Sequence, residues 1–492
     1  MKLAELIARE YLSDEIVLQD DQSALSTGFF IEHLARCRNQ LAALDPPGPV
    51  GLLADNGFDW IIADLTCQEL DRTILPLPTF FTARQLQHAL DSTGTNLLFA
   101  QGKLPTAFTH FDYRGPVAGT DLSCFQRRRL CSPVSLPKNT GKITFTSGST
   151  GTPKGVCLSH AQQIHQAQAL SQIVNIETPR HLCLLPLSTL LENIAGIYAP
   201  LLSHGQVIAP SLSEMGFSGS ALTAPRRLLN SISRHQPDSL ILVPQLLQVL
   251  VGAGESGWPV PENLKFIAVG GSRVAGDLLL RAERLGLPVY EGYGLSECCS
   301  VVSLNTPHNR KRGTAGKPLP HLDVRIDNGD VVIRGNSMLG YVGQVTSCFQ
   351  DEIRSGDLGN FDSDGYLTIS GRRKNIIINS MGRNVSPEWV ESELLANTGI
   401  AEAVVLGDNR PYCVALLTLR DPALSERNLT DWVRRVNDGL PDYARLRQWL
   451  VLPRLLQEEE GLVTGNGRPR RDVINEKFTT EITELYRQRV VA

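Results

Sequence analysis

Short apolar runs alternate with helical patterns along the first part of the chain. Residues 50–53, 74–76 and 96–100 are short and largely apolar, which is typical of buried strands. Between these runs, residues 60–69 and 83–92 place apolar side chains three to four positions apart and predict helices with one buried face. This order of strand, helix and strand predicts a parallel α/β sheet covered by helices.

A second series of the same kind follows further along the chain. Its pattern predicts helices and strands in alternation, at residues 226–234, 240–243, 245–251, 266–269, 275–285 and 289–291. The glycine-rich segments 270–272 and 292–294 follow two of these strands. Because ligands of open α/β sheets bind beyond the carboxyl ends of the strands, we expect a ligand crevice at these segments. Ordinary turns explain either segment equally well.

The pattern changes again in the last third of the chain. Short strands at residues 324–326 and 331–333 predict a small β unit, and a basic polar stretch follows at residues 371–375. We place a domain boundary in that stretch, which gives predicted domains at residues 1–373 and 374–492. The predicted elements of the second domain are at residues 376–378, 387–397, 403–407, 413–419, 431–438 and 472–487. The expected fold class is therefore α/β, with a large N-terminal domain of two α/β subdomains plus a small β unit and an α+β C-terminal domain.

Composition narrows the class of protein. With 492 residues and 42% hydrophobic positions, the chain is long enough for more than one domain. A net charge of −4 gives no overall attraction to nucleic acid. No apolar stretch reaches the ~18 residues of a membrane span, and residues 1–10 lack the apolar core of a secretion signal. The ten cysteines form no C-x-x-C pair and are expected to be reduced thiols. We expect a cytoplasmic protein without a transmembrane segment or a nucleic-acid partner.

The segment at residues 144–155, with the sequence TFTSGSTGTPKG, is the best indicator of function. Its glycines let backbone N–H groups turn toward phosphate oxygens, its hydroxyls donate further hydrogen bonds, and Lys154 adds a point charge. It is not a Walker A loop, because Pro153 precedes the lysine and Gly155 follows it. Apolar flanks predict that the loop joins two strands. A flexible polar surface loop is the alternative interpretation.

Four motifs in the same order resemble the adenylate-forming superfamily of acyl-CoA synthetases, luciferases and peptide-synthetase adenylation domains. They lie at residues 144–155, 293–297, 355–367 and 371–387. The resemblance implies a large N-terminal domain and a mobile C-terminal lid that hinges near Lys374. It also implies a two-step reaction, in which a carboxylate attacks ATP to give acyl-AMP and pyrophosphate and a thiol then displaces AMP.

The resemblance implies which residues bind ATP and Mg²⁺. Attack at phosphorus brings two anions together, so the site has to neutralise charge. The implied catalytic residues are Lys154, Glu297 and Arg468, and the implied metal ligands are Glu297 and Thr150. The implied nucleotide-binding residues come from the loop, the glycine segments and the later motifs: Thr146, Ser147, Gly148, Ser149, Thr150, Gly151, Gly271, Ser272, Tyr293, Gly294, Ser296, Asp357 and Arg372.

Three of these residues have a specific role implied by the family. Tyr293 offers a flat face to adenine, Asp357 accepts hydrogen bonds from the ribose hydroxyls, and Arg372 donates to the same sugar. Outside this context, an Asx turn and a surface cation are the ordinary interpretations of Asp357 and Arg372.

Residues 185–193 look like the acyl-pocket motif of long-chain fatty acyl synthetases. Thr189 stands where the family commonly has histidine, and Asn193 stands where the long-chain branch has arginine. The segment has no aspartate of the kind that holds the ammonium of an amino acid substrate. Glu192 is an alternative ligand for that ammonium, but the long-chain-like context favours a structural carboxylate. The motif favours an apolar acyl substrate.

Arg468 occupies the position of the lysine that serves the first half-reaction in the family. A guanidinium keeps the positive charge and binds phosphate bidentately, but it is wider and planar. One hypothesis is that Arg468 still stabilises the transition state. The other is that the lid serves mainly the transfer step.

The leading prediction is an ATP-dependent acid–thiol ligase that takes a carboxylic acid and passes the acyl group to CoA or to the phosphopantetheine of an acyl carrier protein. Gly382 is interpreted as a point where a pantetheine arm passes the backbone, although an ordinary turn explains it as well. The alternatives are an amide-forming ligase and a degenerate nucleotide or acyl-AMP sensor. The presence of Lys154, Glu297, Asp357 and Arg372 argues against the sensor, because a protein that only binds a nucleotide has less need of a magnesium ligand.

Overall fold

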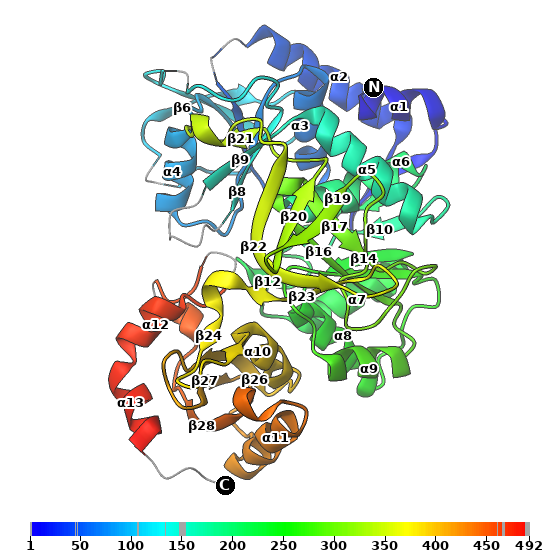
Figure 1. The fold of residues 1–492 in the computed structure, drawn as a ribbon. Helices are drawn as coiled ribbons and strands as arrows, with labels where there is room; N and C mark the ends of the chain where they lie inside the picture. Colours follow the sequence, from blue (N-terminus) through cyan, green and yellow to red (C-terminus); the bar gives the residue numbers. More distant parts are fainter. Residues whose placement is uncertain are drawn as a thin grey trace.

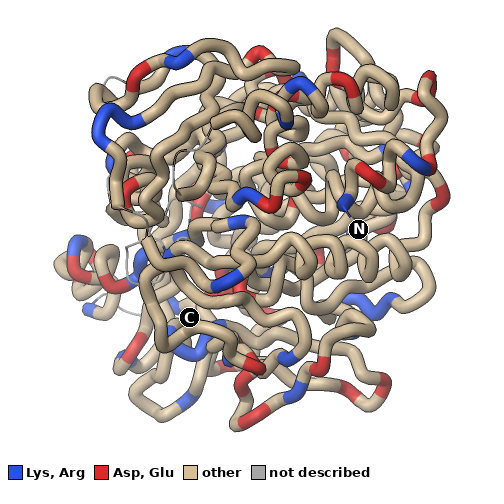
Figure 2. The backbone as a smooth tube through the Cα atoms, turned by 90° about the horizontal axis from the view of Figure 1, so that it is seen from above, with Lys and Arg blue, Asp and Glu red and all other residues tan. Residues whose placement is uncertain are grey.

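The computed structural model describes residues 2–44, 46, 48–105, 108–132, 134–146, 154–459, 461–464 and 468–487. Figure 1 shows a large N-terminal domain, from blue to yellow, and a smaller C-terminal domain, from gold to red, joined through the yellow strands. This mixed α/β architecture confirms the predicted fold class. Figure 2 shows basic and acidic residues intermixed along the described chain.

The first large sheet has eight strands, in the order β21-β9-β8-β4-β3-β5-β7-β6. Its parallel centre is formed by β3, β4, β5 and β8, and antiparallel strands complete both edges. The strands are β3 (Val50–Leu53), β4 (Ile74–Pro76), β5 (Leu97–Ala100), β6 (Phe111–Pro116), β7 (Ser123–Arg127), β8 (Lys142–Thr146), β9 (Lys154–Leu158) and β21 (Gly340–Tyr341). The predicted helices are present as α3 (Phe58–Glu69) and α4 (Ala83–Ser92), where Thr82 and Gln85 form a capping box.

The second large sheet has nine strands, in the order β18-β17-β16-β15-β14-β10-β11-β1-β2. Adjacent strands from β16 to β1 run parallel, so their carboxyl ends lie at one edge. The strands are β1 (Ile16–Gln19), β2 (Ala24–Ser26), β10 (Arg180–Leu182), β11 (Gln206–Ile208), β14 (Ser239–Leu242), β15 (Phe266–Val269), β16 (Val289–Leu295), β17 (Ser300–Leu304) and β18 (Lys317–Pro318). The predicted helices of this series are α7 (Pro225–His235), α8 (Pro244–Glu255) and α9 (Gly276–Arg284).

One expectation about this sheet was wrong. Segment 270–272 follows β15 as predicted, but residues 292–294 lie inside β16 rather than beyond its end. The strand continues because residues 292–295 leave the parallel partner β15 and pair antiparallel with β17. A Cβ on Gly294 would overlap the backbone carbonyl of Ser300, so this glycine permits the close approach of β17.

Several elements have no counterpart in the sequence-based prediction. Helices α2 (Thr27–Ala43) and α5 (His160–Val174) pack against the N-terminal core, and α6 (Ala199–Leu202) lies beside them. Helix α1 (Leu3–Glu10), in contrast, agrees with the helical pattern that residues 1–10 carry in the sequence. In α5 the buried positions include Gln163 and Gln166, which blurs the apolar stripe that marks a helix in sequence. A short hairpin, β12 (Phe217–Ser218) and β13 (Ala221–Leu222), completes this region.

The predicted β unit is a four-stranded antiparallel sheet in the order β19-β20-β22-β23. Its strands are β19 (Asp323–Asp327), β20 (Asp330–Arg334), β22 (Glu352–Phe361) and β23 (Leu367–Arg372). Residues 362–365 form the turn between the last two strands, and the register places Asp357 opposite Arg372. Two residues from separate motifs are thus brought together by strand pairing.

The C-terminal domain is α+β, as predicted. Its three-stranded sheet contains β26 (Ile400–Leu406), β27 (Cys413–Leu419) and β28 (Leu446–Val451), and β24 (Ile377–Ile378) pairs with β25 (Asn384–Val385). Its helices are α10 (Pro387–Leu395), α11 (Glu426–Asp438), α12 (Arg471–Lys477) and α13 (Thr479–Arg487). The single helix expected at residues 472–487 is therefore two helices. None of the helices in the described part of the chain is both long and apolar enough to span a membrane.

Candidate functional site

The polar loop joins two strands, as predicted. Strands β8 and β9 form an antiparallel hairpin in which Thr146 pairs with Lys154. Residues 147–153 lie outside the described residues, so the structure gives no geometry for Ser147, Gly148, Ser149, Thr150 and Gly151. Lys154 is exposed at the first position of β9, and its ammonium lies 5.1 Å from the centroid of the Tyr341 ring. The lysine is thus held at the mouth of the loop by a cation–π contact.

Tyr341 also joins this lysine to Glu297. The Tyr341 hydroxyl donates a hydrogen bond to Glu297 Oε1 over 2.9 Å. Burial, followed by the charge of Glu297, raises the pKa of Tyr341, so this hydroxyl stays protonated as a donor. A carboxylate is the hard oxygen ligand that Mg²⁺ prefers, so the chemistry of Glu297 fits the implied metal role. Thr150, the other implied ligand, is outside the described residues.

Asp357 is the centre of a second cluster. It is 5% exposed, and its carboxylate accepts hydrogen bonds from the Tyr293 hydroxyl at 2.7 Å and from Arg372 Nε at 2.8 Å. Burial, followed by the charge of Asp357, raises the pKa of Tyr293. The sequence motifs predict that all three residues bind the nucleotide, but they do not indicate that the three side chains contact one another.

Arg468 reaches this cluster from the C-terminal domain. Its Nη2 donates a hydrogen bond of 2.8 Å to the carbonyl of Gly271, which follows β15 with a φ of +86°. Residue 468 keeps solvent-accessible surface, but its guanidinium lies in the cleft, where burial and then the charge of Arg372 lower the pKa of Arg468. Burial and Arg372 also lower the pKa of Lys374. Three cations therefore lie close enough to repel one another, which favours an anion between them.

The sequence-predicted residues around Asp357 line a single large cleft between the two domains. The cleft has a volume of about 2630 Å³. The predicted residues that line it are Gly271, Ser272, Tyr293, Gly294, Ser296, Asp357, Arg372 and Arg468. Lys154 and Glu297 are not among the residues that line the cleft. Glu297 directly follows Ser296, which does line it, and Lys154 contacts Tyr341, the hydrogen-bond partner of Glu297.

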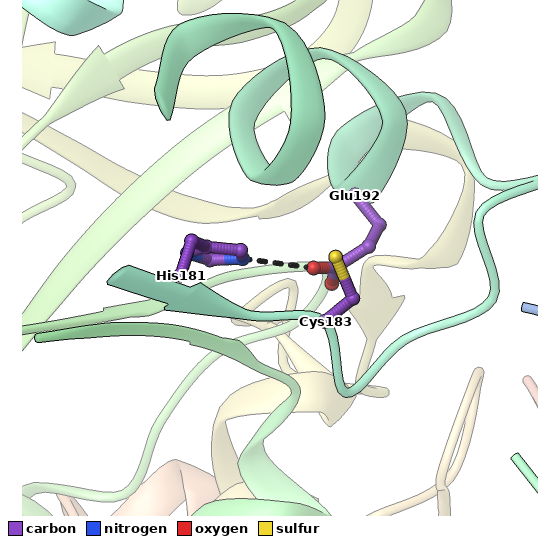
Figure 3. A group of neighbouring side chains, drawn as sticks. All are labelled: His181, Cys183 and Glu192. Carbon is purple, nitrogen blue, oxygen red and sulfur yellow. Dashed lines mark hydrogen bonds and ion pairs between the residues drawn. The ribbon is translucent and has the colours of Figure 1, made fainter. Parts of the chain in front are cut away.

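Glu192 lies in the interior of the acyl-pocket segment. Figure 3 shows the His181 ring pointing at its carboxylate, with Cys183 beside them. Glu192 Oε1 is 3.0 Å from His181 Nε2, and Glu192 Oε2 accepts the Leu185 amide hydrogen at 3.2 Å. His181 Nδ1 is 2.9 Å from the Ser239 hydroxyl, and Cys183 Sγ is 3.8 Å from the Gly196 carbonyl. Each of the three side chains therefore has a hydrogen-bond partner within the protein, which supports the interpretation of Glu192 as a structural carboxylate.

The end of the acyl-pocket segment forms a buried ion-pair network that sequence reasoning missed. Lys142 Nζ lies 2.8 Å from Asp64 Oδ1 and also donates to Asn193 Oδ1. Asp64 Oδ2 accepts hydrogen bonds from the Tyr198 hydroxyl at 2.6 Å and from Asn193 Nδ2 at 3.0 Å. Asn193, the position where the long-chain branch has arginine, thus links β8 to the π-helical turn Glu192–Tyr198. The local sequence signal for this network is the position of Asp64 within the apolar residues of α3, where the carboxylate is buried.

Glu291 is a titratable group at the cleft wall with a predictable effect on stability. Burial raises the pKa of Glu291 to about 7, although the Gly313 amide, which donates a hydrogen bond to Oε2 at 2.9 Å, opposes the rise. A carboxyl group whose pKa is higher in the folded state stabilises the fold below its unfolded pKa of 4.5, and this contribution is lost as pH rises to about 7. As pH rises between these values, the wild type should lose up to about 3 kcal/mol of unfolding free energy, and Glu291→Gln should not show this loss. Urea unfolding at pH 5 and pH 8 measures the difference, and parallel pH profiles of the two proteins would contradict it.

Comparisons with known proteins place the chain in a family. Residues 7–342 match the model of the AMP-binding enzyme family, and residues 374–490 match the AMP-binding enzyme C-terminal domain. The chain is 31% identical to the 2-succinylbenzoate–CoA ligase of Bacillus subtilis, with 92% of this chain and 94% of the relative covered. It is 26% identical to the long-chain-fatty-acid–CoA ligase FadD15 of Mycobacterium bovis, with 87% of this chain and 86% of the relative covered.

Solved structures share the fold. An anthranilate CoA ligase, AuaEII, in complex with anthranoyl-AMP superposes with a TM-score of 0.79 at 16% identity, covering 97% of each chain. The o-succinylbenzoate CoA synthetase of Bacillus subtilis, in complex with its acyl-adenylate intermediate, gives a TM-score of 0.78 at 23% identity and covers 96% of this chain and 97% of that one. The chain therefore belongs to the AMP-binding enzyme family, as its motifs indicated, and is an adenylate-forming acid–thiol ligase.

Proposed function

We propose that this enzyme activates an apolar, fatty-type carboxylic acid with ATP and transfers the acyl group to the thiol of CoA or of a carrier-protein phosphopantetheine. The observation that carries this proposal is the contact between Arg468 and Gly271, which brings a cation of the C-terminal domain into the cleft that holds Asp357 and Arg372. Residues 1–373 form the proposed adenylation domain, and residues 374–492 form a proposed mobile lid.

The proposed first step joins two anions, the carboxylate and the α-phosphate of ATP. Arg372, Lys374 and Arg468 supply positive charge around the phosphates, and Lys154 with the polar loop, from Thr146 onward, holds the outer phosphates. Glu297 would hold Mg²⁺, which supplies further charge neutralisation when bound. The oxygen pair of Asp357 suits the two ribose hydroxyls, and Tyr293 lies next to it where adenine would stack. Carboxylate attack then forms the P–O bond of acyl-AMP and releases pyrophosphate.

The shape of the cleft supports an apolar acid. The lining includes residues at both ends of β10: Leu185, after its carboxyl end, and Pro179, before its amino end. The span between these two residues corresponds to about 20 Å of extended chain. Most side chains along it are apolar and come from the sheet, α5 and the π-helical turn: Leu170, Val174, Ile241, Phe266, Ala268 and Ala195. Such a lining suits a long alkyl chain better than a small polar acid.

The test of this proposal is ATP–pyrophosphate exchange over a panel of fatty, aryl and amino acids. The relatives named above act on a long-chain fatty acid and on 2-succinylbenzoate, so both acids belong in the panel. We expect exchange to be fastest with fatty acids, because each buried CH₂ adds about 0.8 kcal/mol of binding free energy. Faster exchange with an aryl acid would reject the apolar-chain part of the proposal. Product analysis with CoA and with a carrier protein then identifies the acceptor.

A further inference from the structure

One short segment of the N-terminal domain receives several contacts from the C-terminal domain. We call residues 271–281 the docking segment; it follows β15 and includes most of α9. Figure 1 shows α10 on the side of the C-terminal domain that faces α8 and α9. At one end of the docking segment, the Gly271 carbonyl accepts the hydrogen bond from Arg468. The other end contacts α10.

Two contacts and one charged side chain place α10 on the docking segment. Arg281 Nη1 donates to the carbonyl of Ala396, at the end of α10, over 3.0 Å. The guanidinium of Arg273 lies 5.5 Å from the centroid of the Trp389 ring. Glu393, also on α10, lines the cleft together with Arg273 and with Gly276 at the start of α9. Burial raises the pKa of the Glu393 carboxyl group, and the Gly276 amide and the charge of Arg273 oppose that rise. The carboxylate is thus placed near the positive end of the α9 dipole.

The same interface is partly apolar and rigid. Ala396 is 1% exposed and packs in a core cluster formed otherwise by N-terminal side chains. Trp432 packs at the edge of that cluster, and its Nε1 donates to the Leu394 carbonyl at 3.1 Å. Arg281 is itself held by Glu255, through two hydrogen bonds of 2.7 Å. A pre-oriented guanidinium loses little entropy when it donates to the Ala396 carbonyl.

We propose that Arg281 and Glu393 are positioning residues for the first half-reaction, because they hold the C-terminal domain where Arg468 reaches the cleft. Among the described residues, neither Arg281 nor Glu393 forms a hydrogen bond or ion pair with a residue predicted to bind the nucleotide, although Glu393 lines the same cleft. Their effect on activity passes through Arg468, which the docking segment contacts at its other end. This inference rests on the proposed function for its activity readout, but the interface itself is tested without any substrate.

The activity test compares Arg281→Ala, Glu393→Ala and the double variant with the control Arg284→Ala. Arg284 is exposed on the same helix. We expect ATP–pyrophosphate exchange to fall about tenfold in the double variant, since charge-assisted contacts of this kind contribute strongly to docking. Transfer from synthetic acyl-AMP to CoA should stay within about twofold of wild type, because that step does not use ATP. In an Arg468→Ala background, the same substitutions should lower exchange no further. An equal fall of both half-reactions, or unchanged exchange, overturns the proposal.

The substrate-free test is limited trypsin digestion at Arg372, Arg373 and Lys374, between the two domains. Proteolysis follows the population of the open form, so we expect the double variant to be cut at these residues about five- to tenfold faster than wild type and the control variant. Equal cutting rates overturn the proposal. If wild type shows no exchange with any acid, the proposed function fails, and the digestion still decides whether these residues hold the domains together.

Discussion

Arg468→Ala is expected to lower ATP–pyrophosphate exchange by about 10²- to 10³-fold, the loss typical when one preorganised donor to a developing charge is removed. The Arg468 side chain extends from the C-terminal domain and donates a hydrogen bond to the Gly271 carbonyl, next to the ion pair of Asp357 and Arg372. Removing it takes away one of three cations around the proposed phosphate site. Exchange with saturating acid and ATP measures the effect.

Two further measurements separate the two hypotheses for Arg468. Arg468→Lys restores the compact ammonium of the family and should keep exchange within about tenfold of wild type, because the charge is retained. Thioester formation from synthetic acyl-AMP should change little in Arg468→Ala, since the phosphoryl chemistry is already complete. If Arg468→Ala left exchange unchanged but abolished this transfer, the lid would serve mainly the second step.

Lys142→Met is expected to lower the free energy of unfolding by about 3–5 kcal/mol. Lys142 and Asp64 are each 1% exposed, and their ion pair has no access to water. Removing the ammonium leaves the Asp64 carboxylate buried with only the hydrogen bonds of Tyr198 and Asn193. Urea unfolding followed by tryptophan fluorescence is a suitable measurement, because the ammonium lies 5.9 Å from the centroid of a Trp60 ring.

The matched control for Lys142→Met is Lys311→Met. Lys311 pairs with Asp362 at 2.8 Å and Asp364 at 3.0 Å, but it lies at the surface, with 44% of its side chain exposed. Surface pairs contribute about 0–1 kcal/mol, so this variant should change stability little. Adding Asp64→Asn to Lys142→Met should recover part of the loss, because the unpaired charge is removed. Similar losses in Lys142→Met and Lys311→Met would contradict the importance of burial.

Local sequence patterns were sufficient for most of the regular elements. The predicted helix at residues 83–92 and the strand at residues 413–419 have the observed bounds, because each carries its own apolar period and its own turn or cap signals. Helix α5 was missed because its buried face includes glutamines whose partners are distant, such as the Val301 carbonyl that accepts from Gln166 at 2.6 Å. A buried polar residue at a helix face carries no local sign that its partner exists.

The sequence by itself determined the two-domain α/β plan, the family and the residues proposed to bind the nucleotide, since each motif is a short run with its own chemistry. Only the tertiary structure decided which of those residues meet: Asp357 with Tyr293, and Arg468 with Gly271. It also decided the partners that no motif contains, such as Tyr341 beside Glu297 and His181 beside Glu192. The physical reason is that side-chain pairing depends on strand register and domain docking, which bring together residues such as Gly271 and Arg468 that lie 197 positions apart.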